Sequence, residues 1–293
     1  MAYVLVSLLA TSALPPAALP LLALRGGGPV TAVATIKTPK ETYDGMAQKG
    51  ADNAKMPIVK ILHQSIMGGC YVGFGGLLST CVAGGAPGVG ASNPGLQKLI
   101  FAALFPVNLL LILMSGGQLF TGNSAAVPAA LYEGLVDGGD LVKSWVTSYI
   151  GNIIGCGLFA FAAQYTGLLS GGVKELAVAT ATKKCSLAFG PALVRAVMCN
   201  WLVCMAVWLA GSANDLAGKM VGIWFPISTF VAIGLEHSVA NMFLLPLGLL
   251  GGAEVSVFDA LVKNLLPVTL GNAIAGALVV AAGYSYQFGK LSA

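Results

Sequence analysis

Apolar side chains dominate six stretches of the chain, and each stretch is long enough to cross a lipid bilayer as a helix. Within lipid, backbone N–H and C=O groups must find partners inside the protein, so spanning segments are helices of about 20 residues or strands of closed barrels. Alternation of the barrel type is absent from this sequence. We therefore predict an all-α membrane protein. Its expected spans are residues 58–83, 97–134, 141–169, 187–211, 219–250 and 261–285.

Two of these stretches, the second and the fifth, are interrupted by glycine and polar residues. The second contains SGGQLFTGN at residues 115–123, and the fifth contains LEHS at residues 235–238. Irregular backbone at membrane depth leaves amides unpaired, at several kcal/mol each, unless it is buried in protein or lines a wet cavity. Each interruption therefore predicts a broken helix beside a pore, where the positive N-terminus of the second half-helix would attract anions.

The two halves of the chain share one order of elements. YIGNIIGCGLF at residues 149–159 is echoed by TLGNAIAGALV at residues 269–279, and each follows an interrupted stretch. Three spans per half is an odd number, so the second half must enter the membrane from the opposite side. This predicts an inverted repeat, with the broken helices meeting near the middle of the bilayer. Small residues at helical spacing predict close helix packing. They are Gly69 with Gly73, Gly151 with Gly155, and Asn272 with Gly276.

Composition agrees with a membrane protein. Hydrophobic residues make up 57% of the 293-residue chain and charged residues 9%, and the mean hydropathy is +0.84, whereas soluble domains carry about 25% charged residues. Several lysines of residues 37–60 precede the first span, which favours the cytoplasmic or equivalent side for that end. Lysines elsewhere are dispersed and not interleaved with aromatic residues, so nucleic acid is not an expected partner.

The six cysteines show no spacing typical of a metal site. Most fall within predicted spans, where cysteine packs as a small apolar residue, and a bridge between Cys81 and Cys185 is the alternative. No metal or other cofactor is expected. The titratable residues predicted to be buried are too few and too scattered for an enzyme active site, so we predict that the chain is not an enzyme.

The N-terminal region, residues 1–45, differs from the rest because it combines alanines, prolines and glycines with no acidic residue before Glu41. We interpret it as a targeting leader or flexible N-terminal segment, followed by a transmembrane domain at residues 46–293. Signal peptide and organelle transit sequence both fit, as does an apolar helix that is retained. A plastid envelope or other organelle membrane is the expected location, with the plasma membrane as the alternative.

His237 is one of only two histidines, and an ionisable side chain inside a span indicates a functional site. Asn241, four residues later, is predicted to share its helical face and to line the same path, whereas Glu236 is rotated by about 100° towards a neighbouring helix and supports the site from there. We therefore predict that His237 lines the permeation path.

Three segments of the chain resemble the formate/nitrite transporter family. They are LMSGGQLFTGN at residues 113–123, AVMCNWLVCMAVW at 196–208 and FVAIGLEHSVANMFLLPLG at 230–248, in the order of the family's motifs. The similarity covers about residues 46–286. Gln118 departs from the family pattern, which usually has an acidic residue there.

The resemblance implies an aquaporin-like six-helix bundle with an inverted repeat and two broken helices, assembled as a homopentamer with one pore in each protomer. His237 would be the central pore histidine, Thr121 the residue facing it, and Asn200 a neighbour. Lys184 would attract anions in the vestibule, although Lys183 beside it leaves that assignment open. The implied constrictions are Phe105, Leu109, Leu119, Phe120 and Phe230.

The expected function is a channel or transporter for small monovalent weak-acid anions, with nitrite or formate first. Desolvating a bare anion costs many kcal/mol, so we expect the anion to cross together with a proton. The alternatives are a bicarbonate channel of a plastid membrane and a structural membrane subunit that does not transport.

Overall fold

The computed structural model describes residues 36–292, and these residues are helical apart from turns and one isolated bridge between Ile36 and Ala213. Six of the helical segments are long and apolar enough to cross a membrane, which confirms the predicted all-α membrane fold. They are Ile58–Gly84, Pro94–Ser115, Gly138–Tyr165, Phe189–Ser212, Leu216–Ile233 and Val257–Phe288.

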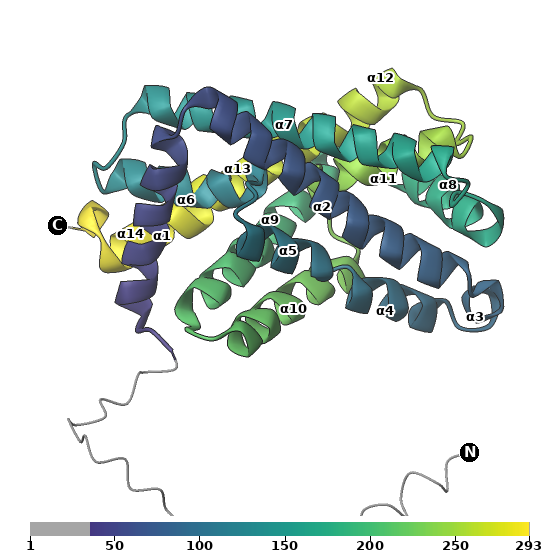
Figure 1. Cartoon of the computed structure of the whole chain (residues 1–293), viewed down its shortest axis with the longest axis horizontal. Helices are drawn as coiled ribbons and strands as arrows, with labels where there is room; N and C mark the ends of the chain where they lie inside the picture. The colour runs from purple at the N-terminus through teal and green to yellow at the C-terminus, as the bar shows by residue number, and fades with distance from the viewer. Residues whose placement is uncertain (1–35, 293) are drawn as a thin grey trace, which may run out of the picture. The chain divides into compact units, whose positions relative to one another are not determined.

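The elements of the first half pack around one broken helix (Figure 1). They are α1 (Pro39–Lys55), α2 (Ile58–Gly84), α3 (Pro87–Ser92), α4 (Pro94–Leu104), α5 (Val107–Ser115), α6 (Phe120–Tyr132) and α7 (Gly138–Tyr165). The expected second span is thus divided into α4, α5 and α6. Pro106 lacks a backbone N–H and stands where α4 gives way to α5. Gly116 ends α5 with a φ of 81°, a left-handed conformation that favours glycine.

The second half repeats this arrangement. Its elements are α8 (Gly171–Cys185), α9 (Phe189–Ser212), α10 (Leu216–Ile233), α11 (Ser238–Leu250), α12 (Val257–Asp259), η1 (Ala260–Leu265), α13 (Leu266–Ile274), η2 (Ala275–Ala282), α14 (Gly283–Phe288) and η3 (Lys290–Ser292). Gly234 ends α10 with a φ of 89°, as Gly116 ends α5. The half-helices α6 and α11 each have 13 residues, with Pro128 and Pro246 at the same position. The fifth stretch is therefore broken where the sequence predicts it.

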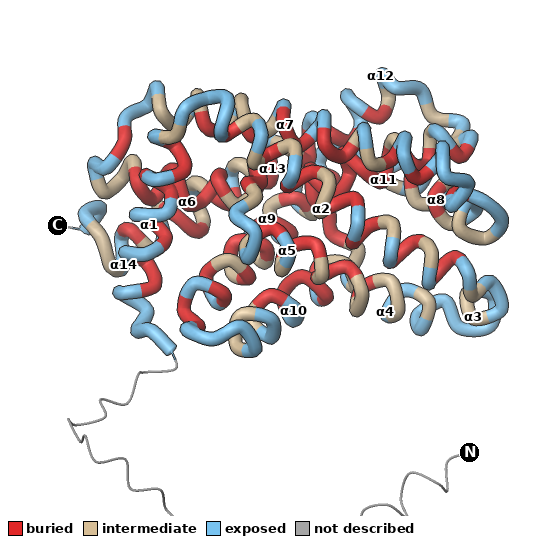
Figure 2. The backbone as a smooth tube through the Cα atoms, viewed as in Figure 1, coloured by how far each residue is buried: buried red, intermediate tan, exposed pale blue. Residues whose placement is uncertain are grey.

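The half-helices lie in the interior. Figure 2 shows α6 and α11 buried along most of their length, whereas α4, α8 and α10 carry exposed faces. Small residues permit this packing. A Cβ added to Gly155 of α7 would collide with the backbone carbonyl oxygen of Ile66 in α2, and one added to Gly276 would collide with Ser124 of α6. These glycines therefore hold the close approach that their spacing predicts.

Three helices, α1, α3 and α8, were not predicted from the apolar pattern. In α1, Thr38 and Glu41 form a capping box at the N-terminus, and Tyr43, Ala47 and Ala51 are buried. The predicted boundary between residues 45 and 46 falls inside this helix. The N-terminal part of the proposed leader, residues 1–35, lies outside the described residues.

The alternative of a bridge between Cys81 and Cys185 is wrong, because all six cysteines are free thiols. Cys81 is half-buried on α2, and Cys185 is buried at the end of α8. The cysteines therefore act as the small packing residues that the sequence favours.

Candidate pore site

Each helix break is held by one buried asparagine from the following long helix. In the first half, Asn152 of α7 accepts a hydrogen bond from the backbone N–H of Phe120 at 2.9 Å. Its amide nitrogen donates to the carbonyl oxygens of Ser65 at 2.8 Å and Gln118 at 2.9 Å. The first N–H of α6, expected to be open to an anion, is thus occupied by the protein. Asn152 closes the break without a ligand.

Asn272 of α13 makes the same three contacts in the second half. Its oxygen accepts from the backbone N–H of Ser238 at 2.8 Å. Its nitrogen donates to the carbonyls of Ala196 at 2.8 Å and Glu236 at 3.1 Å. The two GN echoes in the sequence thus correspond to two equivalent clamps. Sequence reasoning found the echo and assigned Asn272 only to helix packing, so it missed this role.

His237 stands in the second break, as the N-cap of α11, and contacts Thr121 in the first turn of α6. It is buried, and its Nε2 lies 3.0 Å from Oγ1 of Thr121. Its Nδ1 accepts the backbone N–H of Ala240 at 3.0 Å, which caps α11. Because an amide N–H can only donate, Nδ1 carries no proton, and the ring proton of neutral His237 must be on Nε2. Nε2–H therefore donates to Thr121, whose hydroxyl hydrogen stays available for another acceptor.

A small cavity of about 10 Å³ includes His237 in its lining. Its walls are mainly apolar: Phe105, Asn108, Leu109, Leu119, Val203, Ile227, Phe230 and His237. Four of the five predicted constriction residues are in this set. The fifth, Phe120, instead directs its ring edge-on towards Trp145 and Tyr149. Phe120 is therefore part of the packing around the break and does not line this cavity.

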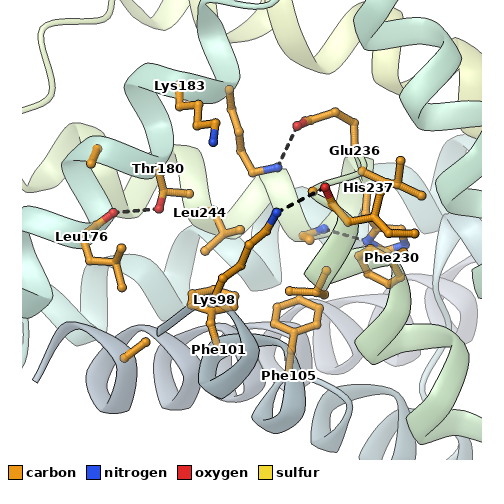
Figure 3. A pocket seen from close by; sticks show the side chains of 18 of the residues that line it. Lys98, Phe101, Phe105, Leu176, Thr180, Lys183, Phe230, Glu236, His237 and Leu244 are labelled. Atoms are coloured by element: carbon orange, nitrogen blue, oxygen red, sulfur yellow. Dashed lines mark hydrogen bonds and ion pairs between the residues drawn. The ribbon is translucent and has the colours of Figure 1, made fainter. Parts of the chain in front are cut away.

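A larger cavity of about 410 Å³ shares His237, Phe105 and Phe230 with the small one, and we call it the vestibule. Figure 3 shows Lys98, Lys183, Glu236 and His237 around it. Lys184 and Arg195 also line it. Both candidate lysines, Lys183 and Lys184, thus face the vestibule. Four cations and one carboxylate among its lining residues make it a site that attracts anions.

The Glu236 carboxylate is buried and fully engaged. It accepts from Lys184 Nζ at 3.1 Å, from Asn241 at 2.7 Å and from Asn264 at 3.1 Å. The prediction that Asn241 shares a helical face with His237 is wrong, because His237 precedes α11 as its N-cap and is not within the helix. Asn241 contacts Glu236 instead. Asn264, which also donates to the carbonyl of Lys184, was missed because its partners are far away in sequence.

Asn200 and Lys98 complete the surroundings of the site. Asn200 donates to Ser124 Oγ at 2.9 Å and to the carbonyl of Asn272 at 2.7 Å, with a longer contact of 3.4 Å to the carbonyl of Thr121. It supports the breaks and does not line either cavity. Lys98, which sequence reasoning missed, donates to the carbonyl of Ile233 at 3.2 Å, at the end of α10 (Figure 3).

Gln118 occupies the loop position where the family resemblance implies an acidic residue. Its side chain is buried and neutral, and it donates to Gln64 Oε1 at 2.8 Å and accepts from Asn123 at 2.9 Å.

Within residues 36–292, no group of three or more His, Cys, Asp or Glu could hold a metal ion.

Six spanning helices, two broken helices in contact at a histidine, and two cavities that both include this histidine in their lining define an integral, multi-pass membrane protein of the pore type. The sequence profile described as formate/nitrite transporter matches residues 40–286. The chain belongs to the formate/nitrite transporter family, which is a transport family and not an enzyme family.

Individual relatives agree with this assignment. A probable formate transporter of Methanothermobacter thermautotrophicus is 42% identical, over 87% of this chain and 98% of the relative. The formate channel BtFdhC of Bacillus thuringiensis is 34% identical, over 85% of this chain and 93% of the relative. Among solved structures, an FNT family ion channel matches with a TM-score of 0.77 at 27% identity, covering 84% of this chain and 98% of that one. A pentameric formate channel with formate bound matches with a TM-score of 0.68 at 27% identity, covering 87% of this chain and 100% of that one.

Proposed function

We propose that this protein conducts small monovalent weak-acid anions, nitrite or formate first, and that each anion crosses together with a proton. One observation carries the proposal. His237 lines both the cationic vestibule and the narrow apolar cavity, and its ring contacts the Thr121 hydroxyl at 3.0 Å. The relatives described as formate transporters and channels support the same class of substrate.

The cost of desolvation explains why a proton would accompany the anion. Lys98, Lys183 and Arg195 raise the local concentration of anions in the vestibule. The next cavity is small and mainly apolar, and a bare charge there would cost several kcal/mol or more. A protonated weak acid avoids most of this cost. We therefore expect flux to rise as the external pH falls towards the pKa of the acid.

His237 would assist as a neutral hydrogen-bond donor. An imidazolium ring would carry a proton on Nδ1, directly opposite the N–H of Ala240, and would lose the cap of α11. The arrangement therefore favours neutral His237, whose Nε2–H orients the Thr121 hydroxyl. The hydroxyl hydrogen can then bind an oxygen of the passing acid. In this mechanism the transported proton comes from the aqueous side and is not stored on the ring.

The protein is further proposed to act as a homopentamer, with one passage in each protomer. The solved structure of a pentameric formate channel with formate bound supports this proposal. Large apolar side chains such as Phe161, Phe225 and Leu278 are 60–61% exposed in the single chain. Lipid and neighbouring protomers would cover such residues. Native mass spectrometry of the detergent-solubilised protein would give five chains, and a monomer as the only species would contradict the proposal.

The decisive experiment measures acid-stimulated uptake in proteoliposomes. Wild-type protein should take up formate and nitrite faster at pH 5.5 than at pH 7.5, and His237→Asn should reduce uptake at least about tenfold. Asparagine is a good N-cap, so this variant keeps the cap of α11 while removing the imidazole. His63→Asn, at the exposed histidine near the start of α2, is the matched control and should retain uptake.

Two outcomes would contradict the proposal. Equal uptake by His237→Asn and wild type would exclude a role for the ring. Absence of flux for every weak acid, from protein that elutes as a single assembled species, would favour the structural subunit. Competition by nitrite, formate, bicarbonate, lactate and hydrosulfide at both pH values would rank the substrates.

The target membrane is proposed from the composition of residues 1–45. A plastid or other organelle membrane fits their alanine-rich character and the absence of acidic residues before Glu41. A fluorescent protein fused to residues 1–45 should reach an organelle, whereas secretion or retention in the cytosol would contradict this proposal.

A further inference from the structure

The inverted repeat pairs each polar residue around one break with a residue around the other. Asn152 donates to the carbonyl of Gln118, and Asn272 donates to the carbonyl of Glu236. Gln118 and Glu236 are therefore equivalent. Each also accepts a hydrogen bond from the asparagine five residues later, Asn123 at 2.9 Å and Asn241 at 2.7 Å.

The same relationship extends to the helices that precede each half. Ser65 and Ala196 are equivalent because their carbonyls accept from Asn152 and Asn272. Asn53 lies twelve residues before Ser65, and Lys184 lies twelve residues before Ala196. These two residues stand near the ends of α1 and α8, and each is bound within its own half's polar network.

The equivalent networks differ in charge. In the second half, Lys184 and Glu236 form an ion pair at 3.1 Å, and Arg195 stands beside Ala196 on the vestibule wall. In the first half, Asn53 donates to Asn123 at 3.0 Å, and Gln118 donates to Gln64 at 2.8 Å. Gln64 takes the place of Arg195 there. Every charged member of the second network is therefore replaced by a neutral amide in the first.

An inverted repeat directs these networks towards opposite sides of the membrane. Gln118 directly precedes Leu119, and Glu236 directly precedes His237, and both Leu119 and His237 line the narrow cavity. The charged network thus stands on one approach to the cavity, which we call the Lys184 mouth, and the amide network stands on the other, the Asn53 mouth. Lys98 and Lys183 add further positive charge to the vestibule lining at the Lys184 mouth, whereas Lys55 and Lys60, which follow Asn53, are exposed and line neither cavity.

We propose that the two mouths bind substrate anions with unequal affinity, so that half-maximal flux needs less substrate at the Lys184 mouth than at the Asn53 mouth. This inference rests on the proposed function and adds a direction to it. A cationic cleft raises the local concentration of anions at least about tenfold at low ionic strength, whereas neutral amides attract no counter-charge. The KM at the Lys184 mouth should therefore be about tenfold lower.

Passive flux imposes a second condition. With equal pH on both sides and no membrane potential, microscopic reversibility requires the same ratio of maximal rate to KM in both directions. A lower KM at the Lys184 mouth must therefore be accompanied by a proportionally lower maximal rate from that side. Scarce anion would then cross equally fast in both directions, whereas at saturating concentrations the flux from the Asn53 mouth would exceed that from the Lys184 mouth.

The test uses wild-type proteoliposomes of known orientation. Asn264 near the start of the last span contacts Lys184, so the C-terminus lies on the side of the Asn53 mouth. Cleavage of a C-terminal tag by external protease then identifies vesicles with that mouth outward. Initial uptake of radiolabelled formate would be measured for both orientations at about 10 mM and about 1 M ionic strength, where the screening length falls from roughly 30 Å to 3 Å.

We expect the ratio of KM at the Asn53 mouth to KM at the Lys184 mouth to be about ten at low salt and to fall towards one at high salt. Active vesicles with equal KM values in both orientations at low salt would overturn it. So would a ratio that does not respond to salt, because the asymmetry would then not come from charge. Absence of flux in both orientations would instead contradict the proposed function, so the two failures are distinguishable.

Variants test the assignment to particular residues. Lys98→Gln with Lys183→Gln removes two positive charges from the vestibule lining and should raise KM at the Lys184 mouth several-fold, while KM at the Asn53 mouth stays unchanged. Lys174→Gln removes one charge from the exposed part of α8, away from the vestibule lining, and should leave both KM values as in wild type. If the double variant does not assemble, the salt-dependent KM ratio of the wild type still decides the proposal.

Discussion

His237 makes two hydrogen bonds that fix its protonation. The backbone N–H of Ala240 requires an unprotonated Nδ1, so the proton must lie on Nε2, towards Thr121. The ring thus serves both as the cap of a half-helix and as the polar group of the passage. This dual role connects the local structure of the break to the chemistry of conduction.

The two clamp asparagines support a prediction at the residue scale. Asn272→Ala would leave the N–H of Ser238 and the carbonyls of Ala196 and Glu236 without this partner in a buried site. Each buried polar group that loses its partner costs about 1–3 kcal/mol. We expect a clear fall in the thermal stability of the purified protein, measured by fluorescence-detected size exclusion after heating.

Gln48→Ala provides the control for that variant, because Gln48 is exposed on α1 and its side chain donates a hydrogen bond to Asp52 in the same helix. It should change stability by less than about 0.5 kcal/mol. A melting temperature for Asn272→Ala equal to that of Gln48→Ala would show that Asn272 does not hold the break.

Single functional residues were predictable where chemistry stood out from its surroundings. A histidine, a threonine and an acidic residue inside apolar stretches indicated His237, Thr121 and Glu236, and the family resemblance implied roles for His237 and Thr121. Asn264 and Lys98 gave no such signal, because their partners Glu236 and Ile233 are set by the packing of distant helices. The position of Phe120 against Trp145 likewise follows from packing that the sequence does not specify.

At the scale of elements, glycine marks where helices break and where they touch. The φ values of Gly116 and Gly234 explain why α5 and α10 end where they do. Both breaks were predictable from these glycines and the polar residues beside them. The helices α1 and α8 were not, because they mix small, polar and charged residues and resemble loops when apolar length is the criterion.

The contact of α2 with α7 supports a prediction at this scale. In Gly155→Ala, the new methyl group would collide with the carbonyl of Ile66 and force the two helices apart. Overpacking of this kind costs about 1–3 kcal/mol. The variant should show lower thermal stability and a smaller assembled fraction by size exclusion.

Gly157 lies on the same helix two residues away, and a Cβ there would meet nothing within 4 Å. Gly157→Ala should be neutral or stabilise the helix by up to about 1 kcal/mol. If both variants lose stability equally, close approach of α2 and α7 is not the reason for Gly155.

At the scale of the whole molecule, Glu133 joins the first and last helices of the described chain. Its carboxylate accepts from Tyr43 of α1 at 2.7 Å, from Ser285 of α14 at 2.7 Å and from the backbone N–H of Lys290 at 3.2 Å. Burial opposes ionisation, but these hydrogen bonds and the charge of Lys290 outweigh it and hold the pKa of Glu133 below its ordinary value.

The lowered pKa of Glu133 predicts the direction in which stability changes with pH. A carboxylate whose pKa is lower in the folded state stabilises the protein at pH values above its ordinary pKa of about 4.3. This stabilisation is lost as the pH falls through the pKa of the folded state. Glu133→Gln should therefore melt below wild type at pH 7, and the two melting curves should converge as the pH falls below about 4. Glu175→Gln, on the exposed face of α8, should show no pH-dependent difference from wild type in its melting temperature. A melting temperature of Glu133→Gln that stays below wild type by the same amount at every pH would contradict the explanation.

The six-span architecture and the inverted repeat followed from the sequence because length, polarity and an odd number of spans per half constrain the topology strongly. The unequal charge of the two approaches did not follow, because it depends on which residues the repeat makes equivalent. Asn53 stands in a helix that the apolar pattern did not predict, so its relation to Lys184 appears only in three dimensions.

The clamp of the first break uses only groups from its own half of the chain: Asn152, Ser65, Gln118 and Phe120. During synthesis, this half can therefore lock its re-entrant loop as soon as residue 152 has left the ribosome and entered the bilayer. The second half can do the same later with its own asparagine. Biogenesis would then proceed as two self-contained folding steps followed by docking, with no conducting path across the membrane until α11 brings its histidine to the first half.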